Sequence, residues 1–258
     1  NLKPVLVDAE IGTYNIDANL LEKNITEKTK GIVLAHTLGN PFHLNEVEKI
    51  CKKYDLFLME DMCDAFGSKF NGDLVGSFGD VATLSFYPAH HITTGEGGAV
   101  LTNNPKLKKI IESLRDWGRD CYCEPGKDNT CKKRYEWELG NLPKGYDHKY
   151  IYSHVGYNLK ATDMQAAIGI SQLEKVDSFI QKRKENFSYL YEKFKEFEMF
   201  DLPLWNELSE PSWFGFPLSL NSKAKFKRED LLRFYEERKI GTRLLFAGNI
   251  TKQPAYLN

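Results

Sequence analysis

The fold of this chain is decided by residues 60–101, which read EDMCDAFGSKFNGDLVGSFGDVATLSFYPAHHITTGEGGAVL. An apolar run, Leu56–Met59, leads into this stretch and is typical of a buried parallel strand. Val81–Phe86 and Ala99–Thr102 predict two further strands. Ligands of open α/β sheets bind outside the carboxyl ends of the strands. We therefore expect the chemistry at the acidic pair that opens residues 60–101.

Strand and helix signals alternate in the residues before this stretch. Pro4–Asp8 and Gly31–Ala35 predict strands. Asp17–Ile25 has helical spacing with Asp17 as the expected N-cap, and Leu44–Tyr54 carries its apolar residues on one helical face. This alternation predicts a parallel sheet with right-handed crossover connections.

The residues after the stretch change character twice. Pro105–Trp117 predicts an amphipathic helix, whereas residues 118–156 have no sustained period and hold three of the five cysteines. A loop of this length in a compact domain tends to be functional. The helical pattern returns from Thr162 to Phe197 with a break or bend, and Trp213–Leu220 then resembles a strand. Arg228–Lys239 predicts a last helix.

The composition narrows the class of protein. The 258 residues are 41% hydrophobic and 28% charged, with a formal net charge of −1. A near-neutral balance gives no electrostatic argument for nucleic acid or an anionic membrane surface. No run approaches the roughly 20 apolar residues that span a bilayer. Five cysteines without an export signal indicate a reducing compartment, so we predict a cytoplasmic protein.

Three motifs together carry a resemblance to a known family. Glu-Asp at 60–61, GDVATLSFYP at 79–88 and TTGEGGAV at 93–100 resemble the DegT/DnrJ/StrS sugar aminotransferases, vitamin B6 enzymes of nucleotide-linked keto sugars. The resemblance implies a type I aminotransferase-like α/β fold, with a mostly parallel sheet, helices on both faces and a smaller C-terminal α+β domain. In that family, a lysine five residues after the serine of Ser-Phe holds pyridoxal phosphate covalently. This chain has His90 there.

The resemblance also implies a domain division. Residues 1–180 would be part of the large cofactor-binding domain, with 118–156 as a cysteine-bearing loop. Residues 181–258 would be a linking helix and a truncated small domain. The chain starts at Asn1 without a methionine, and we find no counterpart of the family's phosphate-gripping turn. We therefore expect a fragment of a longer protein.

The spacing of four of the cysteines is compatible with a metal site. Cys63, Cys121, Cys123 and Cys131 form C-x57-C-x-C-x7-C, while Cys51 stands apart on a predicted helix. Four thiolates can hold zinc or an iron–sulfur cluster, but this spacing matches neither structural zinc sites nor common ferredoxins. Scattered structural cysteines are the alternative. A structural zinc would sit more naturally in the loop alone, whereas a ligand at the mouth of the candidate site favours electron transfer to the cofactor.

Histidine in the lysine position and this cysteine spacing together resemble the iron–sulfur branch of the family, the reductive 3-dehydratases of 3,6-dideoxyhexose synthesis. The similarity includes Gly156–Asn158 and Gly241–Phe246. It implies non-covalent pyridoxamine phosphate and a [2Fe–2S] cluster on the four spaced cysteines. It also implies a CDP-linked 4-keto-6-deoxy sugar as substrate, an NADH-dependent iron–sulfur flavin reductase as electron donor, and a homodimer.

The resemblance assigns roles to single residues. Asp61 would keep the pyridine nitrogen protonated, and Ser85 would bind the cofactor phosphate. His90 would be the base that removes a proton from the cofactor's C4′ carbon, because an imidazole titrates near neutral pH. Asp64 stands where the family has Gln or His beside the ring. Asn158 would reach the phosphate of the neighbouring subunit, which implies shared sites.

Simpler interpretations stand beside these roles. Ser85 could merely end a strand, Asn158 could be a turn residue and Asp64 a cap. His91 could be the base if the register is one residue off. His36 near the expected sugar site is more simply structural, and Arg243 could meet nucleotide phosphates or lie on the surface.

Three functions remain open from the sequence. The first is the reductive dehydratase with a cluster. The second is a B6-dependent 3-dehydratase without a cluster, which releases ammonia and needs no reductase. The third is a non-catalytic binding module on the same scaffold, because loss of the lysine can also mean loss of catalysis.

Overall fold

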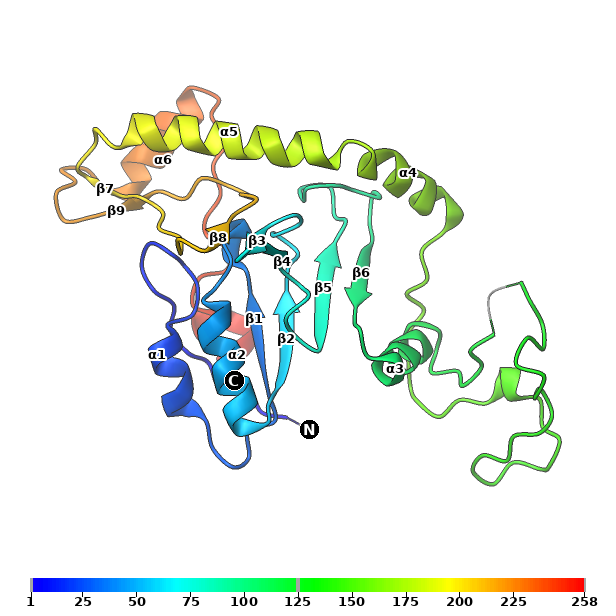
Figure 1. Ribbon diagram of the computed structural model, residues 1–258. Helices are drawn as coiled ribbons and strands as arrows, with labels where there is room; N and C mark the ends of the chain where they lie inside the picture. The colour runs from blue at the N-terminus through cyan, green and yellow to red at the C-terminus, as the bar shows by residue number, and fades with distance from the viewer. Residues whose placement is uncertain (1, 124–125, 258) are drawn as a thin grey trace.

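The computed structural model describes residues 2–123 and 126–257. Its central sheet has the strand order β1-β2-β5-β6 (Figure 1). β1 (Gly31–Ala35), β2 (Phe57–Asp61) and β5 (Val81–Ser85) run parallel, and β6 (Gly98–Leu101) is antiparallel to β5. The mostly parallel α/β sheet predicted from the sequence is confirmed.

The hydrophobic core lies between the sheet and α2 (Leu44–Tyr54). The apolar face of α2 is buried, as its helical spacing predicted. Asp55 follows in the left-handed conformation and ends the helix. The core side chains include Phe42, Leu44, Val47, Ile50, Leu58, Met62 and Phe70.

The first helical segment is shorter than predicted. α1 (Ala18–Leu21) continues as the 3₁₀ helix η1 (Glu22–Asn24). The carboxylate of Asp17 accepts a hydrogen bond from the amide of Asn19, so the predicted N-cap is confirmed.

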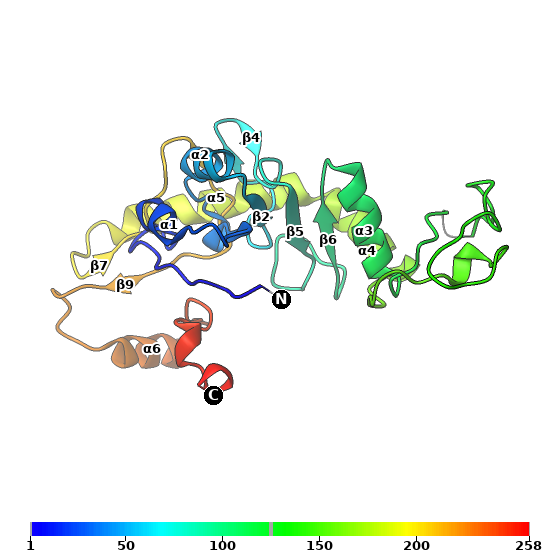
Figure 2. The same cartoon turned by 90° about the horizontal axis from the view of Figure 1, so that it is seen from below.

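The second half of the chain runs away from the sheet and returns. α3 (Pro105–Arg115) follows β6, and the loop 118–156 then extends outward from α3, beyond the β6 edge (Figures 1 and 2). One short 3₁₀ helix, η3 (His148–Tyr150), lies in its described part. α4 (Asp163–Leu173) and α5 (Val176–Phe194) return across the end of the sheet, separated by the predicted break.

Smaller elements complete the described residues. β3 (Lys69–Phe70), β4 (Asp73–Leu74) and β8 (Ser209–Glu210) form a three-stranded antiparallel sheet, and β7 (Phe200–Asp201) pairs with β9 (Ser219–Leu220). The remaining helices are η2 (Thr37–Gly39), α6 (Arg228–Glu237), η4 (Ile250–Lys252) and η5 (Pro254–Tyr256).

Two predicted strands are wrong. Pro4–Asp8 forms no strand, because no strand of the described residues pairs with it and its apolar Val5 and Leu6 are exposed. Trp213–Leu220 pairs only through its last two residues. The carbonyls of its first two residues accept hydrogen bonds from Arg183 instead.

The predicted division at residue 180 falls inside the continuous helix α5, and the two-domain division stays a prediction. Among the helices of the described residues, none combines the length and apolarity required to cross a bilayer.

Candidate active site

The register of the strands brings Asp61, His36 and Ser85 to one edge of the sheet. Ala35 lies beside Asp61, and Asp61 lies beside Thr83, so the carboxyl ends of β1, β2 and β5 meet there. His36 directly follows β1, and Ser85 ends β5. This is the edge at which open α/β sheets bind ligands.

Glu60 stabilises this edge of the sheet from the interior and is not exposed to solvent. Its carboxylate is fully buried and accepts hydrogen bonds from the amides of Gly76 (2.8 Å), Phe78 (2.9 Å) and Gly79 (2.6 Å). His36 donates a further bond through Nε2 at 3.0 Å. Burial alone would raise the pKa of Glu60, but the bonds from His36 and the amides outweigh it and lower the pKa.

His36 is therefore a structural residue. Its ring is 1% exposed and stacks on Phe42 at 4.3 Å between ring centroids. Burial lowers the pKa of His36 despite the neighbouring Glu60. A neutral imidazole that donates to Glu60 accounts for both observations.

His90 lies half-buried between an acidic and an aromatic group. Its Nδ1 is 3.3 Å from Asp64 Oδ1, an ion-pair distance without hydrogen-bond geometry, and this nitrogen has no other polar partner among the described residues. The His90 ring also contacts Phe214, with 5.2 Å between centroids. Burial lowers the pKa of His90, Asp61 opposes this shift, and Arg183 adds to it. The ring is therefore neutral at pH 7, as a general base must be.

Asp64 and Asp61 form an acidic pair beside His90. The carboxylate of Asp61 accepts a hydrogen bond from the amide of Cys63 at 3.0 Å. Burial and the charge of Asp61 raise the pKa of Asp64 to about 6. The carboxyl group of Asp64 and the imidazole of His90 can therefore hold and transfer protons near neutral pH.

Residues 212–214 close this edge through hydrogen bonds to the main chain. The amide of Ser212 donates to Ser68 Oγ at 2.8 Å, and the carbonyl of Ser212 accepts a bond from His91 Nε2 at 2.8 Å. The amide of Phe214 donates to the Leu38 carbonyl at 2.9 Å. The aromatic ring beside His90 is thus fixed from several elements.

Arg183 is the residue of this site that sequence reasoning missed, because a run of charged residues such as that around Arg183 is typical of a solvated helix face. From α5 it donates to the carbonyls of Trp213 (3.3 Å) and Phe214 (3.1 Å). Its charge lowers the pKa values of both His90 and Asp64. The sequence feature that could have indicated a role for Arg183 is that it is an arginine among lysines.

We expect Arg183→Gln to shift the acidic limb of the activity profile to higher pH. Removing the positive charge raises the pKa of His90, so the neutral base is lost at a higher pH. The pH dependence of kcat/KM measures the shift. An unchanged limb would show that the charge of Arg183 does not reach His90; Lys182→Gln, on the exposed face of α5, is the control.

His91 has a structural environment. It is 3% exposed, its Nε2 donates to the Ser212 carbonyl, and its Nδ1 has no polar partner among the described residues. Burial lowers the pKa of His91 to about 4. The alternative that His91 is the base finds no support in this position.

His91 should make stability depend on pH. Its pKa is lower in the folded chain than in the unfolded one, so stability is complete above about pH 6.5 and falls as the pH drops toward 4. Relative to His91→Gln, the wild type should lose up to about 3 kcal/mol over this range. Denaturant unfolding at a series of pH values measures this difference. A difference independent of pH would contradict the assignment.

The remaining predicted residues are less informative. Ser85 Oγ accepts a bond from the amide of Tyr87 at 3.2 Å. Asn158 is exposed and pairs with Asp116 through an isolated bridge, so its role toward a neighbouring subunit stays a prediction. Arg243 is exposed, and its guanidinium bonds the carbonyl of Thr242.

Cys63 lies between Asp61 and Asp64 in the sequence, just after β2. Its Sγ is 3.9 Å from Thr83 Oγ1. Burial and then Asp61 raise the pKa of Cys63 to about 12. Cys51 is buried in α2, and burial raises its pKa to about 11. Both thiols are therefore protonated at neutral pH.

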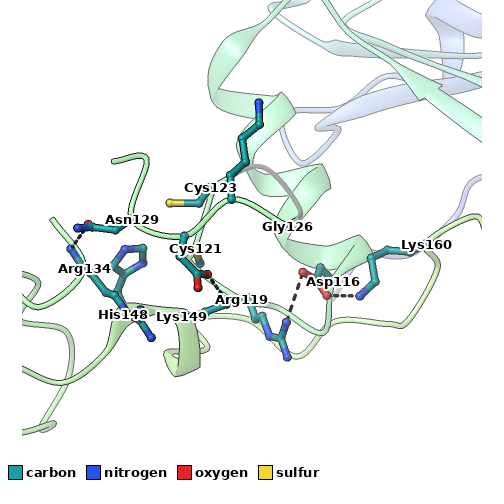
Figure 3. Close-up of a pocket in the computed structure, with 12 residues that line it drawn as sticks. Asp116, Arg119, Cys121, Cys123, Gly126, Asn129, Arg134, His148, Lys149 and Lys160 are labelled. Carbon is teal, nitrogen blue, oxygen red and sulfur yellow. Dashed lines mark hydrogen bonds and ion pairs between the residues drawn. The ribbon is translucent and has the colours of Figure 1, made fainter. Parts of the chain in front are cut away.

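In the loop 118–156, Cys121 and Cys123 lie near His148 (Figure 3). The ligand atoms of Cys121, Cys123 and His148 all lie within 4.8 Å of one another. Cys131 Sγ lies 3.1 Å from His148 Nε2. A bond from Thr130, with further bonds from Cys131 and Cys121, lowers the pKa of Cys123 to about 7.

The predicted set of four cysteine ligands is not assembled in this structure. Among the described residues, the ligand group contains His148 but not Cys63. Cys63 follows β2, whereas the loop extends away from the sheet (Figures 1 and 2). Spacing in the sequence cannot determine how a long loop without regular structure folds back on the sheet.

Comparison with known proteins decides the family. The profile of the DegT/DnrJ/EryC1/StrS aminotransferase family matches residues 1–258. The chain belongs to this family. It is 60% identical over its whole length to the lipopolysaccharide biosynthesis protein RfbH of Salmonella typhimurium. It is 56% identical, over 99% of its length, to dTDP-4-dehydro-2,6-dideoxy-D-glucose 3-dehydratase of Saccharopolyspora spinosa.

Solved structures of the family have the same fold. The structure of E. coli GDP-4-keto-6-deoxy-D-mannose-3-dehydratase with bound hydrated PLP matches 97% of this chain with a TM-score of 0.83 and 30% identity. The match covers 62% of that protein. The chain likewise spans 59% and 55% of the two curated relatives. The predicted type I aminotransferase-like fold is confirmed.

The residues at the strand edge fit the family's B6 cofactor. Asp61 offers a carboxylate for the pyridinium nitrogen, and Ser85 offers a hydroxyl for the phosphate. His90, which the motif spacing predicts at the position of the family's lysine, has a buried Nδ1 without a hydrogen-bond partner among the described residues. Among the described residues, Cys63 is not in the ligand group that Cys121, Cys123 and His148 form, so a cluster shared by the four cysteines stays a prediction.

Proposed function

We propose that the full-length protein catalyses the C3 dehydration of a nucleotide-linked 4-keto-6-deoxy sugar with pyridoxamine phosphate. The observation that carries the proposal is the half-buried His90, predicted at the lysine position, with its Nδ1 3.3 Å from Asp64 Oδ1. A histidine cannot hold the cofactor covalently as lysine does, but it can transfer protons. Two of the relatives above carry the name 3-dehydratase.

The chain's residues divide the work as follows. When bound, pyridoxamine phosphate supplies an amine for the sugar ketone and a ring that accepts electrons. Asp61 keeps the ring nitrogen protonated, and Ser85 binds the phosphate. Asp64 lies at Nδ1 of His90 and leaves Nε2 to take up the proton. Arg183 fixes Phe214 against the His90 ring.

Product analysis tests this proposal. Full-length protein is incubated with pyridoxamine phosphate, a chemical reductant and CDP-4-keto-6-deoxyglucose, and mass spectrometry follows the sugar. A product that has lost the C3 hydroxyl supports the proposal. A 4-amino sugar, or recovery of unchanged substrate while the cofactor binds, contradicts it.

The finer proposal is CDP-4-dehydro-6-deoxyglucose 3-dehydratase, a cytoplasmic homodimer that uses a [2Fe–2S] cluster and a flavin reductase. The cysteine spacing and His90 support it. When bound, such a cluster supplies electrons one at a time. The proposal requires the loop 118–156 to move to Cys63, because the thiolates of Cys121, Cys123 and Cys131 lie in the loop.

Metal content tests the cluster. Protein purified without oxygen should contain two iron and two acid-labile sulfide per chain. Cys63→Ser should lose both, whereas Cys51→Ser, in the core of α2, should keep them. Cluster content that survives Cys63→Ser would remove Cys63 from the ligand set.

The position of Cys63 favours a second candidate, a 3-dehydratase without a cluster. That enzyme would release ammonia and need no reductant. Ammonia produced in step with dehydration, by protein free of iron, would establish the second candidate and contradict the first.

A further inference from the structure

We propose that Leu38, in the turn after β1, is a positioning residue whose main chain holds Asp64 and Phe214 against His90. Leu38 lies in η2 with a φ of 55° and a ψ of 26°, which is the left-handed region. Leucine seldom adopts this conformation, because its Cβ crowds the following carbonyl oxygen. Surrounding contacts must therefore enforce it, and backbone outliers of this kind cluster at functional sites.

The main chain of Leu38 contacts both neighbours of the His90 ring. Its carbonyl accepts a hydrogen bond from the amide of Phe214 at 2.9 Å. Its main chain also hydrogen-bonds the carboxyl group of Asp64. Asp64 Oδ1 lies 3.3 Å from His90 Nδ1, and the ring centroids of Phe214 and His90 are 5.2 Å apart. One residue thus orients the acidic and the aromatic neighbour of the imidazole.

The next residue of the turn packs directly on the same two segments. Gly39 has a φ of 85°, and a Cβ on it would lie 2.2 Å from the carbonyl oxygen of Ser212 and 2.9 Å from that of Asp64. The fully buried Ser68 donates through Oγ to the Gly39 carbonyl at 2.7 Å and accepts a bond from the amide of Ser212 at 2.8 Å. A change in the conformation of Leu38 should therefore displace both segments together.

This role requires the main-chain conformation of Leu38 rather than its side chain, and the two can be separated by substitution. Isoleucine has the same atoms as leucine, but its branched Cβ makes the left-handed region still less accessible. Glycine adopts this region without cost, and asparagine tolerates it. Leu38→Ile should therefore disturb the site, whereas the smaller Leu38→Gly and Leu38→Asn should not.

Steady-state dehydration tests this order and rests on the proposed function. Full-length protein is assayed with the cofactor, reductant and sugar of the product analysis. Leu38→Ile should lower kcat about 10- to 100-fold, as expected for a misplaced catalytic group, and leave KM for the sugar unchanged. Leu38→Gly and Leu38→Asn should keep the wild-type kcat. Leu34→Ile is the matched control and should keep it too, because β-branched residues fit an extended strand such as β1.

Labelling of His90 by diethyl pyrocarbonate, located by mass spectrometry, does not depend on the proposed function. The His90 side chain is 16% exposed, so cofactor-free wild type should react slowly there. Leu38→Ile should raise the labelling rate of His90 several-fold, with no change at the exposed His154, which serves as the internal reference. Leu38→Gly and Leu38→Asn should leave both rates unchanged.

The outcomes separate the role of Leu38 from the activity. Wild-type kcat and labelling in Leu38→Ile would overturn the inference. Equal losses of kcat in Leu38→Gly and Leu38→Ile would also overturn it, because the side chain would then be the required part. If Leu38→Ile does not fold, Leu38→Asn decides, and faster labelling of its His90 contradicts the inference. Failure of the wild type to dehydrate the sugar would instead contradict the proposed function, and the labelling rates alone would then test Leu38.

Discussion

His90→Asn is expected to reduce C3 dehydration about 1,000-fold while pyridoxamine phosphate still binds. A positioned general base contributes about 10² to 10⁴ in rate, and asparagine cannot take up a proton. The His90 side chain is half-buried, and its Nδ1 has no hydrogen-bond partner among the described residues. Steady-state dehydration and cofactor binding, followed by absorbance, measure the two properties separately.

His154→Asn is the control for this prediction, because His154 lies in the distant loop and bonds only Ser113 among the described side chains. It should retain full activity. If His90→Asn dehydrates the substrate at the wild-type rate, His90 is not the base. If it loses cofactor binding as well, the histidine is a binding residue rather than a proton acceptor.

Glu60→Gln is expected to destabilise the protein by about 3 kcal/mol. The carboxylate accepts bonds from three amides and from His36, all in the interior. An amide group would face at least one of these donors with an N–H group of its own, which leaves a buried donor unpaired. Denaturant unfolding of wild type and variant at pH 7 measures the loss.

Glu46→Gln is the matched control, since Glu46 is exposed on α2 and its carboxylate pairs with the exposed Lys49. Its effect should stay within about 0.5 kcal/mol. The cost of Glu60→Gln should disappear at low pH, because the folded-state pKa of Glu60 is lowered and the wild-type advantage is lost as the pH falls through it. Equal stability of the two proteins at pH 7 would contradict this account of Glu60.

The central sheet was predictable because its signal is local. Apolar runs bounded by turns predicted β1, β2, β5 and β6, and the helical spacing predicted α2. Pro4–Asp8 shows the limit, because an apolar run forms a strand only where another strand pairs with it. The sequence of those five residues does not indicate whether another strand lies beside them.

The candidate site was predictable only in part. Asp61, Ser85 and His90 lie at or after the ends of strands, and the parallel order of these strands brings them to one edge. They could therefore be predicted from their positions in the sequence. Arg183 approaches from α5, almost a hundred residues beyond His90, and no local pattern indicates that contact. His148 was missed for the same reason, because its neighbours depend on how the long loop folds.

The most direct test of the central claim is the release of deuterium from pyridoxamine phosphate labelled at its C4′ carbon. With full-length protein and a CDP-4-keto-6-deoxy sugar, the label should appear in solvent. It should stay on the cofactor without the sugar, or with His90→Asn. Release at the wild-type rate from His90→Asn, or none from the wild type during dehydration, would contradict the assignment of His90 as the base.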